Sequence, residues 1–94
     1  MPIVGLLKID VQIPECRSLK AKRKIVQSIT TRLRQRFNVS VAEVDFQDKW
    51  QRCRIGVSVV SNDSQFVDSQ LRKVLNCLEG MGLTNVVDFD IEIF

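Results

Sequence analysis

Two runs of strand-forming residues joined by a short polar turn, VSVAEVDFQDKWQRCRIGVSVV at residues 39–60, decide the fold of this chain. From Cys53 to Val59 an apolar side chain stands at every second position, which is typical of a strand with one buried face. Residues 39–46 are rich in β-branched side chains, and residues 47–49 are polar. We therefore expect an antiparallel hairpin in the middle of the chain.

The sequence leaves the phase of the first hairpin strand ambiguous. Val39 and Val41 would share one face of this strand, whereas Ala42, Val44 and Phe46 would share the other. We take Val44 and Phe46 as the residues that face the core.

A strand and a helix precede this hairpin. Residues 7–13 alternate apolar and polar side chains, and Pro14 then ends the strand. Ser18 is a favourable N-cap for the helix that follows at residues 19–36. That helix is indicated by apolar side chains at helical spacing, namely Ile25, Val26, Ile29, Leu33 and Phe37.

A second helix and a fourth strand follow the hairpin. Residues 61–64, SNDS, supply N-cap chemistry, and Gly80 and Gly82 mark the end of the helix. Residues 87–93 then alternate apolar and acidic side chains, as a half-buried strand does. The helix itself carries an apolar stripe made by Val67, Leu71, Val74, Leu75 and Leu78.

This order of elements predicts an α+β fold of the ferredoxin-like (split βαβ, or βαββαβ) kind, in a single domain over residues 1–94. The sheet should be antiparallel, with strand order 4-1-3-2 and both helices on one face. We expect a core made by Ile9, Val11, Ile25, Ile29, Leu33, Ile55, Val57, Leu71, Leu75, Phe89 and Ile91. The other face should be open and charged, with Lys8, Asp10, Arg52, Arg54, Asp88, Asp90 and Glu92.

The positive charge of the chain is concentrated around the first helix. The net charge is +3, yet residues 16–42 hold eight basic residues and no acidic one. Several of these cations crowd the first turns, where the helix dipole is already positive and a cation is unfavourable unless an anion is nearby. Ala21 stands where a capping box would place Glu or Gln. A solvated helix face is the plain alternative, but we predict an anion-binding site formed by Arg17, Ser18, Lys20, Lys22, Arg23, Lys24 and Arg34.

The composition excludes several kinds of chemistry. The chain contains no histidine, which removes Ser-His and Cys-His nucleophilic pairs and imidazole metal ligands. Its three cysteines form no CxxC pair, so we expect neither a disulfide framework nor a zinc site built on spacing. No apolar run is long enough to span a bilayer, and no signal peptide is recognisable. We expect a cytoplasmic protein without cofactor, metal or membrane association, and we do not expect an enzyme.

A cation site on the last strand and a reactive thiol are weaker hypotheses. Three acidic residues at period two offer oxygen ligands, but basic residues on neighbouring strands can pair with them instead. Cys16 precedes the basic helix, where a thiolate would be favoured, yet no base or resolving partner is evident. Cys53 falls in the core phase of its strand. The acidic residues are Asp88, Asp90 and Glu92, and the basic ones are Lys8, Arg52 and Arg54.

Two activities known on this architecture lack their usual residues here. RNA-recognition domains stack bases on aromatic side chains of the central strands, but on the open face only Trp50 qualifies. We favour a role for Trp50 in packing, either within the hairpin or at an interface. Acylphosphatases use an Arg and an Asn, for which Arg17 and Asn38 could be proposed. Their phosphate loop is rich in glycine, whereas residues 13–18 contain none. Contact with RNA is therefore expected at the phosphate backbone rather than at the bases.

Four segments spread over nearly the whole chain resemble a known family. They are SLKAKR at residues 18–23, FNVSVAEV at 37–44, DKW at 48–50 and VSND at 60–63. Together they resemble the YlxP-like family of small bacterial proteins of unknown function, although members often carry Glu at the position of Ala21. The resemblance implies a ferredoxin-like fold and, because genes of the family often lie beside those of transcription and translation factors, a tie to RNA or the ribosome. It supplies no catalytic residue.

From these observations we expect a binding protein with one of two kinds of partner. The first is a polyanion, most plausibly structured RNA in a translation-related particle, bound with weak sequence preference. The second is another protein, including a further copy of this chain as a homo-oligomer, because the open sheet face and exposed edge strands of a small domain are able to pair.

Overall fold

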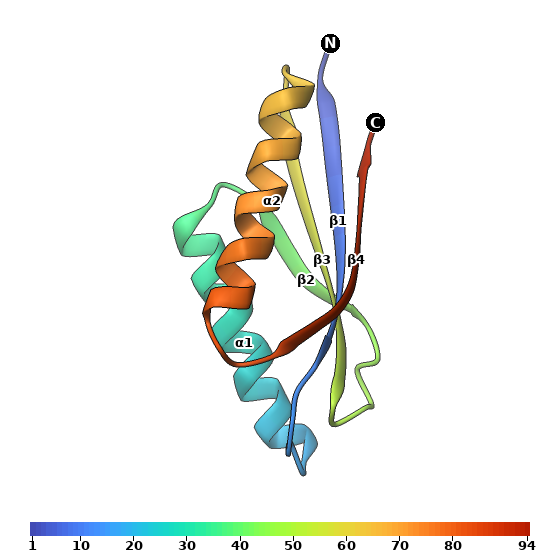
Figure 1. Cartoon of the computed structure of the whole chain (residues 1–94), viewed down its shortest axis with the longest axis vertical. Coiled ribbons are helices and arrows are strands. Elements are labelled where there is room, and N and C mark those ends of the chain that lie inside the picture. The colour runs from blue at the N-terminus through green and yellow to red at the C-terminus, as the bar shows by residue number, and fades with distance from the viewer.

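The computed structural model describes residues 1–94 and has the predicted order of elements (Figure 1). Neighbouring strands are antiparallel, and the sheet order is β2-β3-β1-β4. Both helices cover one face of the sheet, and the other face is open (Figure 1). These findings confirm the predicted ferredoxin-like α+β fold. The elements are β1 (Ile3–Gln12), α1 (Leu19–Arg36), β2 (Ser40–Asp45), β3 (Arg52–Ser61), α2 (Ser64–Gly80) and β4 (Asn85–Ile93).

The core lies between the two central strands and the helices. In the register of β1 and β3, Ile9 stands opposite Ile55 and Leu7 opposite Val57, and all four side chains are fully buried. Most of the predicted core is confirmed as buried, namely Ile9, Val11, Ile29, Leu33, Ile55, Val57, Leu71 and Leu75. Ile25 and Ile91 are only partly buried and pack against this core from its edge.

The predicted phase of β2 was wrong. Val41 is 6% exposed and belongs to the core, whereas Val44 is 49% exposed. The pairing of β2 with β3 shifts between Glu43 and Asp45, which marks a β-bulge. With Val41 inward, regular alternation turns Val44 toward the open face, where it packs over Gly56: a Cβ atom on that glycine would lie 2.9 Å from Val44 Cγ1. The bulge then places Asp45 opposite Arg54.

The burial predicted for Phe89 on β4 was also wrong. Its side chain is 44% exposed, although its strand partner Ile9 is fully buried. A register shift in the pairing of β1 with β4 makes Val86, instead of Val87, the neighbour of Val11. β4 is an edge strand, so its inward side chains have core neighbours on one side only.

Helix α2 packs closely against β1 at Gly5. A Cβ atom there would clash with Val67 Cγ1 and would lie 2.9 Å from Leu71 Cδ1. Glycine at this position therefore allows the start of α2 to rest directly on the strand. Neither helix is long and apolar enough to cross a membrane.

The two chain termini lie at one end of the molecule, and α1 begins at the other (Figure 1). Val4 and Phe94 exchange backbone hydrogen bonds of 3.3 Å and 2.8 Å, which join the ends of β1 and β4. At the opposite end, Gln51 Nε2 donates a hydrogen bond of 3.2 Å to the Cys16 carbonyl. This bond holds the β2–β3 connection against the loop that leads into α1.

Candidate anion-binding surface

Ser18 caps the start of α1, as predicted. Its backbone is extended (φ −160°, ψ 155°), and its Oγ accepts a hydrogen bond of 3.0 Å from the Ala21 amide. No acidic residue lies in the first turn of the helix, so the positive end of the helix dipole has no local counter-charge. Ser18 therefore fixes where the helix begins. The cations that follow are held at a well-defined helix end.

Lys22 has to be removed from the predicted site, because it is a buried structural residue. It is 1% exposed, and its Nζ donates a hydrogen bond to the Phe46 carbonyl. The same Nζ lies 2.9 Å from Glu43 Oε2, a distance that makes an ion pair although the geometry is not that of a hydrogen bond. Glu43 lies on β2, outside the basic run of the sequence, so that run gave no sign of this partner. Lys22 faces the sheet and has no surface to offer an external anion.

The Lys22 contact also explains an unusual backbone conformation at Phe46. Phe46 has φ +63°, in the left-handed region that a bulky side chain rarely adopts. Its carbonyl accepts from Lys22, and its amide donates a hydrogen bond of 2.7 Å to Asp45 Oδ1. These two bonds hold the end of β2 in place beneath α1.

Four predicted site residues, Arg17, Lys20, Arg23 and Lys24, are exposed at the start of α1. None of them has an acidic partner in the structure. Arg34 is exposed as well, but its Nη2 donates a hydrogen bond of 3.3 Å to the Val41 carbonyl and so also ties α1 to β2. The ion pairs of the protein lie elsewhere, between Lys22 and Glu43, Arg54 and Asp10, Arg54 and Asp45, and Arg72 and Asp68.

Trp50 is exposed at the same end of the molecule. Its side chain is 51% exposed, so it is not buried within the hairpin, and packing at an interface stays a prediction. Because neighbouring Gln51 bonds to Cys16, the indole lies on the connection that abuts the approach to α1. Lys49 and Arg52 line a shallow hollow together with Trp50 and add positive charge there, next to the acidic Asp48.

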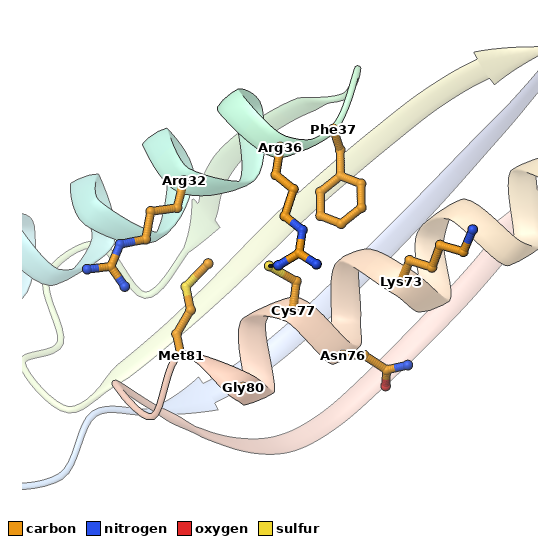
Figure 2. A pocket seen from close by; sticks show the side chains of 8 residues that line it. All are labelled: Arg32, Arg36, Phe37, Lys73, Asn76, Cys77, Gly80 and Met81. Carbon is orange, nitrogen blue, oxygen red and sulfur yellow. Dashed lines mark hydrogen bonds between the residues drawn. The ribbon is translucent and has the colours of Figure 1, made fainter.

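A second cationic cluster lies between the helices and was not predicted. Arg32 and Arg36 on α1 line a groove of about 680 Å³ together with Lys73 and Asn76 on α2. Of these four side chains, Arg36 reaches toward the other helix, and the other three point outward (Figure 2). The one available sequence signal was the four-residue spacing of the two arginines, which places them on the same side of a helix. The sequence gave no sign that α2 contributes to this cluster, because that contribution depends on how the two helices lie side by side. The groove is completed by Phe37, Cys77, Gly80 and Met81.

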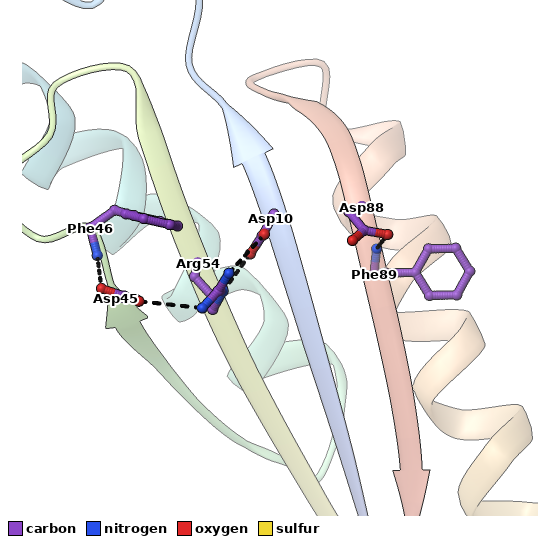
Figure 3. Close-up of polar contacts among 6 residues, drawn as sticks. All are labelled: Asp10, Asp45, Phe46, Arg54, Asp88 and Phe89. Atoms are coloured by element: carbon purple, nitrogen blue, oxygen red, sulfur yellow. Dashed lines mark hydrogen bonds and ion pairs between the residues drawn. The ribbon is translucent and has the colours of Figure 1, made fainter.

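The open sheet face carries an ion-pair network around Arg54 (Figure 3). Arg54 Nε and Nη2 lie 2.6 Å and 3.0 Å from the two carboxylate oxygens of Asp10, and Nη1 lies 3.3 Å from Asp45 Oδ2. Hydrogen bonding to Arg54 holds the pKa of Asp10 below its usual range, and the same bond raises the pKa of Arg54. We expected Arg54 to be available to the acidic residues of β4, but these hydrogen bonds engage it with Asp10 and Asp45 instead.

The three cysteines are free thiols in different surroundings. Cys16 is buried, and its Sγ donates a weak hydrogen bond of 3.5 Å to the Ser18 carbonyl. Cys53 is in the core, as predicted, where burial and then the nearby Glu43 raise the pKa of its thiol. Cys77 alone is partly exposed. No group of three or more His, Cys, Asp or Glu side chains is placed to hold a metal ion.

The fold and this surface define a small ferredoxin-like α+β protein with a cationic helix layer. Over residues 4–91 the chain matches the family described as "Protein of unknown function (DUF503)", and it belongs to that family. It is 36% identical over 73 residues to the "Uncharacterized protein YlxP" of Bacillus subtilis (strain 168), over 78% of this chain and 79% of the relative. The predicted YlxP-like relationship is thereby confirmed.

Two solved structures are similar in fold. The de novo designed protein Foldit4 matches with a TM-score of 0.58 at 12% identity, over 100% of this chain and 97% of the design. LarC2, the C-terminal domain of a cyclometallase involved in the synthesis of the NPN cofactor of lactate racemase, has a TM-score of 0.48 at 10% identity, over 100% of this chain and 56% of that one. The likeness to Foldit4 concerns the fold alone. The likeness to LarC2 is too weak to support a conclusion about this chain.

Proposed function

We propose that this chain binds structured RNA through the start of α1. The observation that carries the proposal is the group of exposed cations Arg17, Lys20, Arg23 and Lys24, none of which has an acidic partner. They gather at the positive end of a helix dipole, where their mutual repulsion is relieved when an anion binds. Phosphate groups in series, as in a nucleic-acid backbone, match such a surface.

The surroundings of this cluster favour RNA with unpaired nucleotides over a uniform duplex. The exposed Trp50 offers a face on which an unpaired base can stack, and base–aromatic stacking tolerates any sequence. The central strands of the open face carry ionic side chains and no aromatic platform, so base-specific reading on the sheet is not part of the proposal. Affinity is assigned mainly to phosphate contacts, and sequence preference should be weak.

The test is a salt titration of binding to a fluorescent RNA hairpin with a single-stranded tail, followed by anisotropy. Each phosphate contact contributes about 0.7 to 0.9 to the slope of log K against log salt, so replacing the four cations with Gln should reduce the slope by about 3. Lys22 is left unchanged because it is structural. The matched control is Lys8→Gln on the open sheet face, which should leave the slope as it is.

The same variants can be tested on natural RNA. We expect the wild-type protein, isolated from its own cells, to carry RNA that can be sequenced, and the four-fold Gln variant to carry much less. Equal recovery by both proteins, or equal salt slopes in the titration, would reject the surface. The Lys8→Gln variant again serves as the control for a general loss of positive charge.

A second candidate function is self-association, and exposed apolar side chains on β4 and directly after it favour it. Phe89, Ile93 and Phe94 are 44%, 41% and 68% exposed, and β4 is an edge strand whose outer backbone groups have no partner strand. Two copies of such a strand pair antiparallel about a two-fold axis, which would bring these apolar residues together. The same pairing would bring together the acidic residues Asp88, Asp90 and Glu92, which repel one another.

The acidic residues give self-association a salt dependence opposite to that of RNA binding. Added salt screens their repulsion and should strengthen pairing through β4, whereas it weakens phosphate contacts. Sedimentation velocity over about a hundredfold range of protein concentration, at low and high salt, measures this effect. A monomer under all of these conditions contradicts self-association. A dimer that Phe89→Ser and Ile93→Ser leave intact contradicts pairing through β4.

A further inference from the structure

The groove between α1 and α2 has the dimensions of a ligand site. Its volume of about 680 Å³ lies within the range of about 300 to 1,000 Å³ that small-molecule sites occupy. Small residues on α2 keep it open: nothing lies within 4 Å of the place where Gly80 would carry a Cβ atom, and Cys77 is the neighbouring small side chain. Figure 2 shows Arg36 reaching across from α1 toward Cys77 on α2.

The charged side chains of the groove are all positive. Arg32 and Arg36 come from α1, Lys73 comes from α2, and no acidic residue lines the space. Arg36 by itself is accounted for by the negative end of the α1 dipole, since it lies in the last turn of that helix. Lys73 is in the middle of α2 and gains nothing from a helix end, yet it lines the same groove as the two arginines and has no acidic partner. The side-chain amide of Asn76 adds hydrogen-bonding capacity next to it.

The walls beside these cations are flat and apolar. Phe37 and Met81 line the groove, and the Arg36 guanidinium lies 5.7 Å from the centre of the Phe37 ring. An aromatic ring and a guanidinium plane are the two surfaces on which proteins stack unpaired bases. The groove therefore combines phosphate-binding groups with a stacking surface.

We propose that this groove binds one nucleotide, with its base placed against Phe37 and Met81 and its phosphate held by Arg36, toward which the long, exposed side chains of Arg32 and Lys73 turn on binding. If the nucleotide is an unstacked position of the bound RNA, the groove proposal rests on the proposed function. A free mononucleotide offers the same chemistry. Lys20 and Arg36 are about 24 Å apart at a rise of 1.5 Å per helical residue, so a mononucleotide reaches only the groove while an RNA strand can reach both cation clusters.

Cys77 provides a built-in reporter for the groove. Cys16 and Cys53 are buried, so Cys77 is the thiol that a neutral reagent such as iodoacetamide should label in the folded protein. Its labelling rate, followed by mass spectrometry of the peptide, is measured with no ligand, with AMP or UMP, with a single-stranded oligonucleotide, and with inorganic phosphate. If the groove is occupied, labelling should slow by a factor of 1 + [L]/Kd, which is about tenfold at ten times Kd.

Two variants and one control assign the protection to the groove. Arg36→Gln and Lys73→Gln should each abolish most of the protection, read as the ratio of rates with and without ligand within each variant. Arg72→Gln is the matched control, because Arg72 is next to Lys73 on the same helix but is paired with Asp68. Circular dichroism of each variant checks that the fold is intact, which is expected because the three substituted residues are exposed.

Each outcome separates this site from the RNA surface at the start of α1. RNA that binds in the anisotropy assay but leaves the Cys77 rate unchanged overturns the groove and leaves the proposed function standing. Protection by a mononucleotide without RNA binding supports the groove and rejects the proposed function. Protection by inorganic phosphate as strong as that by nucleotides, or protection that survives Lys73→Gln, overturns the nucleotide proposal. No protection by any ligand overturns it as well.

Discussion

Replacing Lys22 with methionine should destabilise the fold by about 4 kcal/mol, because it leaves a carboxylate and a carbonyl without their partner under α1. Removing one partner of a buried ion pair costs about 3 to 5 kcal/mol. The Glu43 side chain is 18% exposed, so some water reaches it and the lower end of this range applies. The Phe46 carbonyl also loses its donor, which adds about 1 kcal/mol. This is a large share of the roughly 5 to 15 kcal/mol that stabilises a domain.

Urea unfolding followed by circular dichroism measures the loss, with Lys24→Met as the exposed control that should change stability by less than about 0.5 kcal/mol. The melting temperature of Lys22→Met should fall by about 4 to 8 °C for each kcal/mol. Adding Glu43→Leu should restore most of the stability, because replacing both partners of a buried ion pair with apolar side chains often leaves stability unchanged or raises it.

Three results would contradict this account of Lys22. One is stability of Lys22→Met within about 0.5 kcal/mol of the wild type, since a buried pair cannot be lost at so small a cost. A second is a double variant as unstable as Lys22→Met alone, because the unpaired carboxylate would then not be the cause. The third is a lower salt slope for RNA binding by Lys22→Met at temperatures where it is folded, which would return Lys22 to the binding surface.

Three further predictions follow from packing and ionisation. Gly5→Ala should cost about 1 to 3 kcal/mol in urea unfolding, since its methyl group would overlap Val67; an unchanged midpoint would contradict the close approach of α2. Val41→Ala should cost about 1.5 to 3 kcal/mol and Val44→Ala clearly less, and the reverse order would restore the strand phase first predicted. The lowered pKa of Asp10 means that its carboxylate stabilises the fold above the ordinary value of 3.8, and that this contribution is lost as pH falls through the folded-state pKa. Asp10→Asn should therefore lower the free energy of unfolding at neutral pH and make that free energy fall less steeply in acid. An unchanged pH profile would show that the pair with Arg54 contributes nothing to stability.

The sequence predicted those features that depend on local periodicity. The bounds of α1, the alternation through Ile9 and Ile55, and the capping role of Ser18 are all set by residues close together in the chain, and all were found. Family membership was likewise readable, because it rests on contiguous segments.

Features that depend on contacts between distant elements were not predictable. The phase of β2 places Glu43 on the helix-covered face, where Lys22 can reach it, and neither residue alone signals the pair. The exposure of Phe89 follows from the position of β4 at the sheet edge, where alternation looks the same as in a covered strand. The cationic groove needs Lys73 from the second helix beside the arginines of the first, and residue spacing along one helix does not report on its neighbour.

The hydrogen bonds between Val4 and Phe94 make this chain suited to circular permutation. Chain ends that lie side by side can be joined by a short linker without disturbing the strands they terminate. The joined chain could be reopened in the connection between α2 and β4, where Gly82 is exposed and has φ +70°. All four strand positions in the sheet would be kept, while α2 would become the last element of the chain. A permuted protein of this kind would leave both cation clusters in their places and would free a new end of α2 for a reporter group.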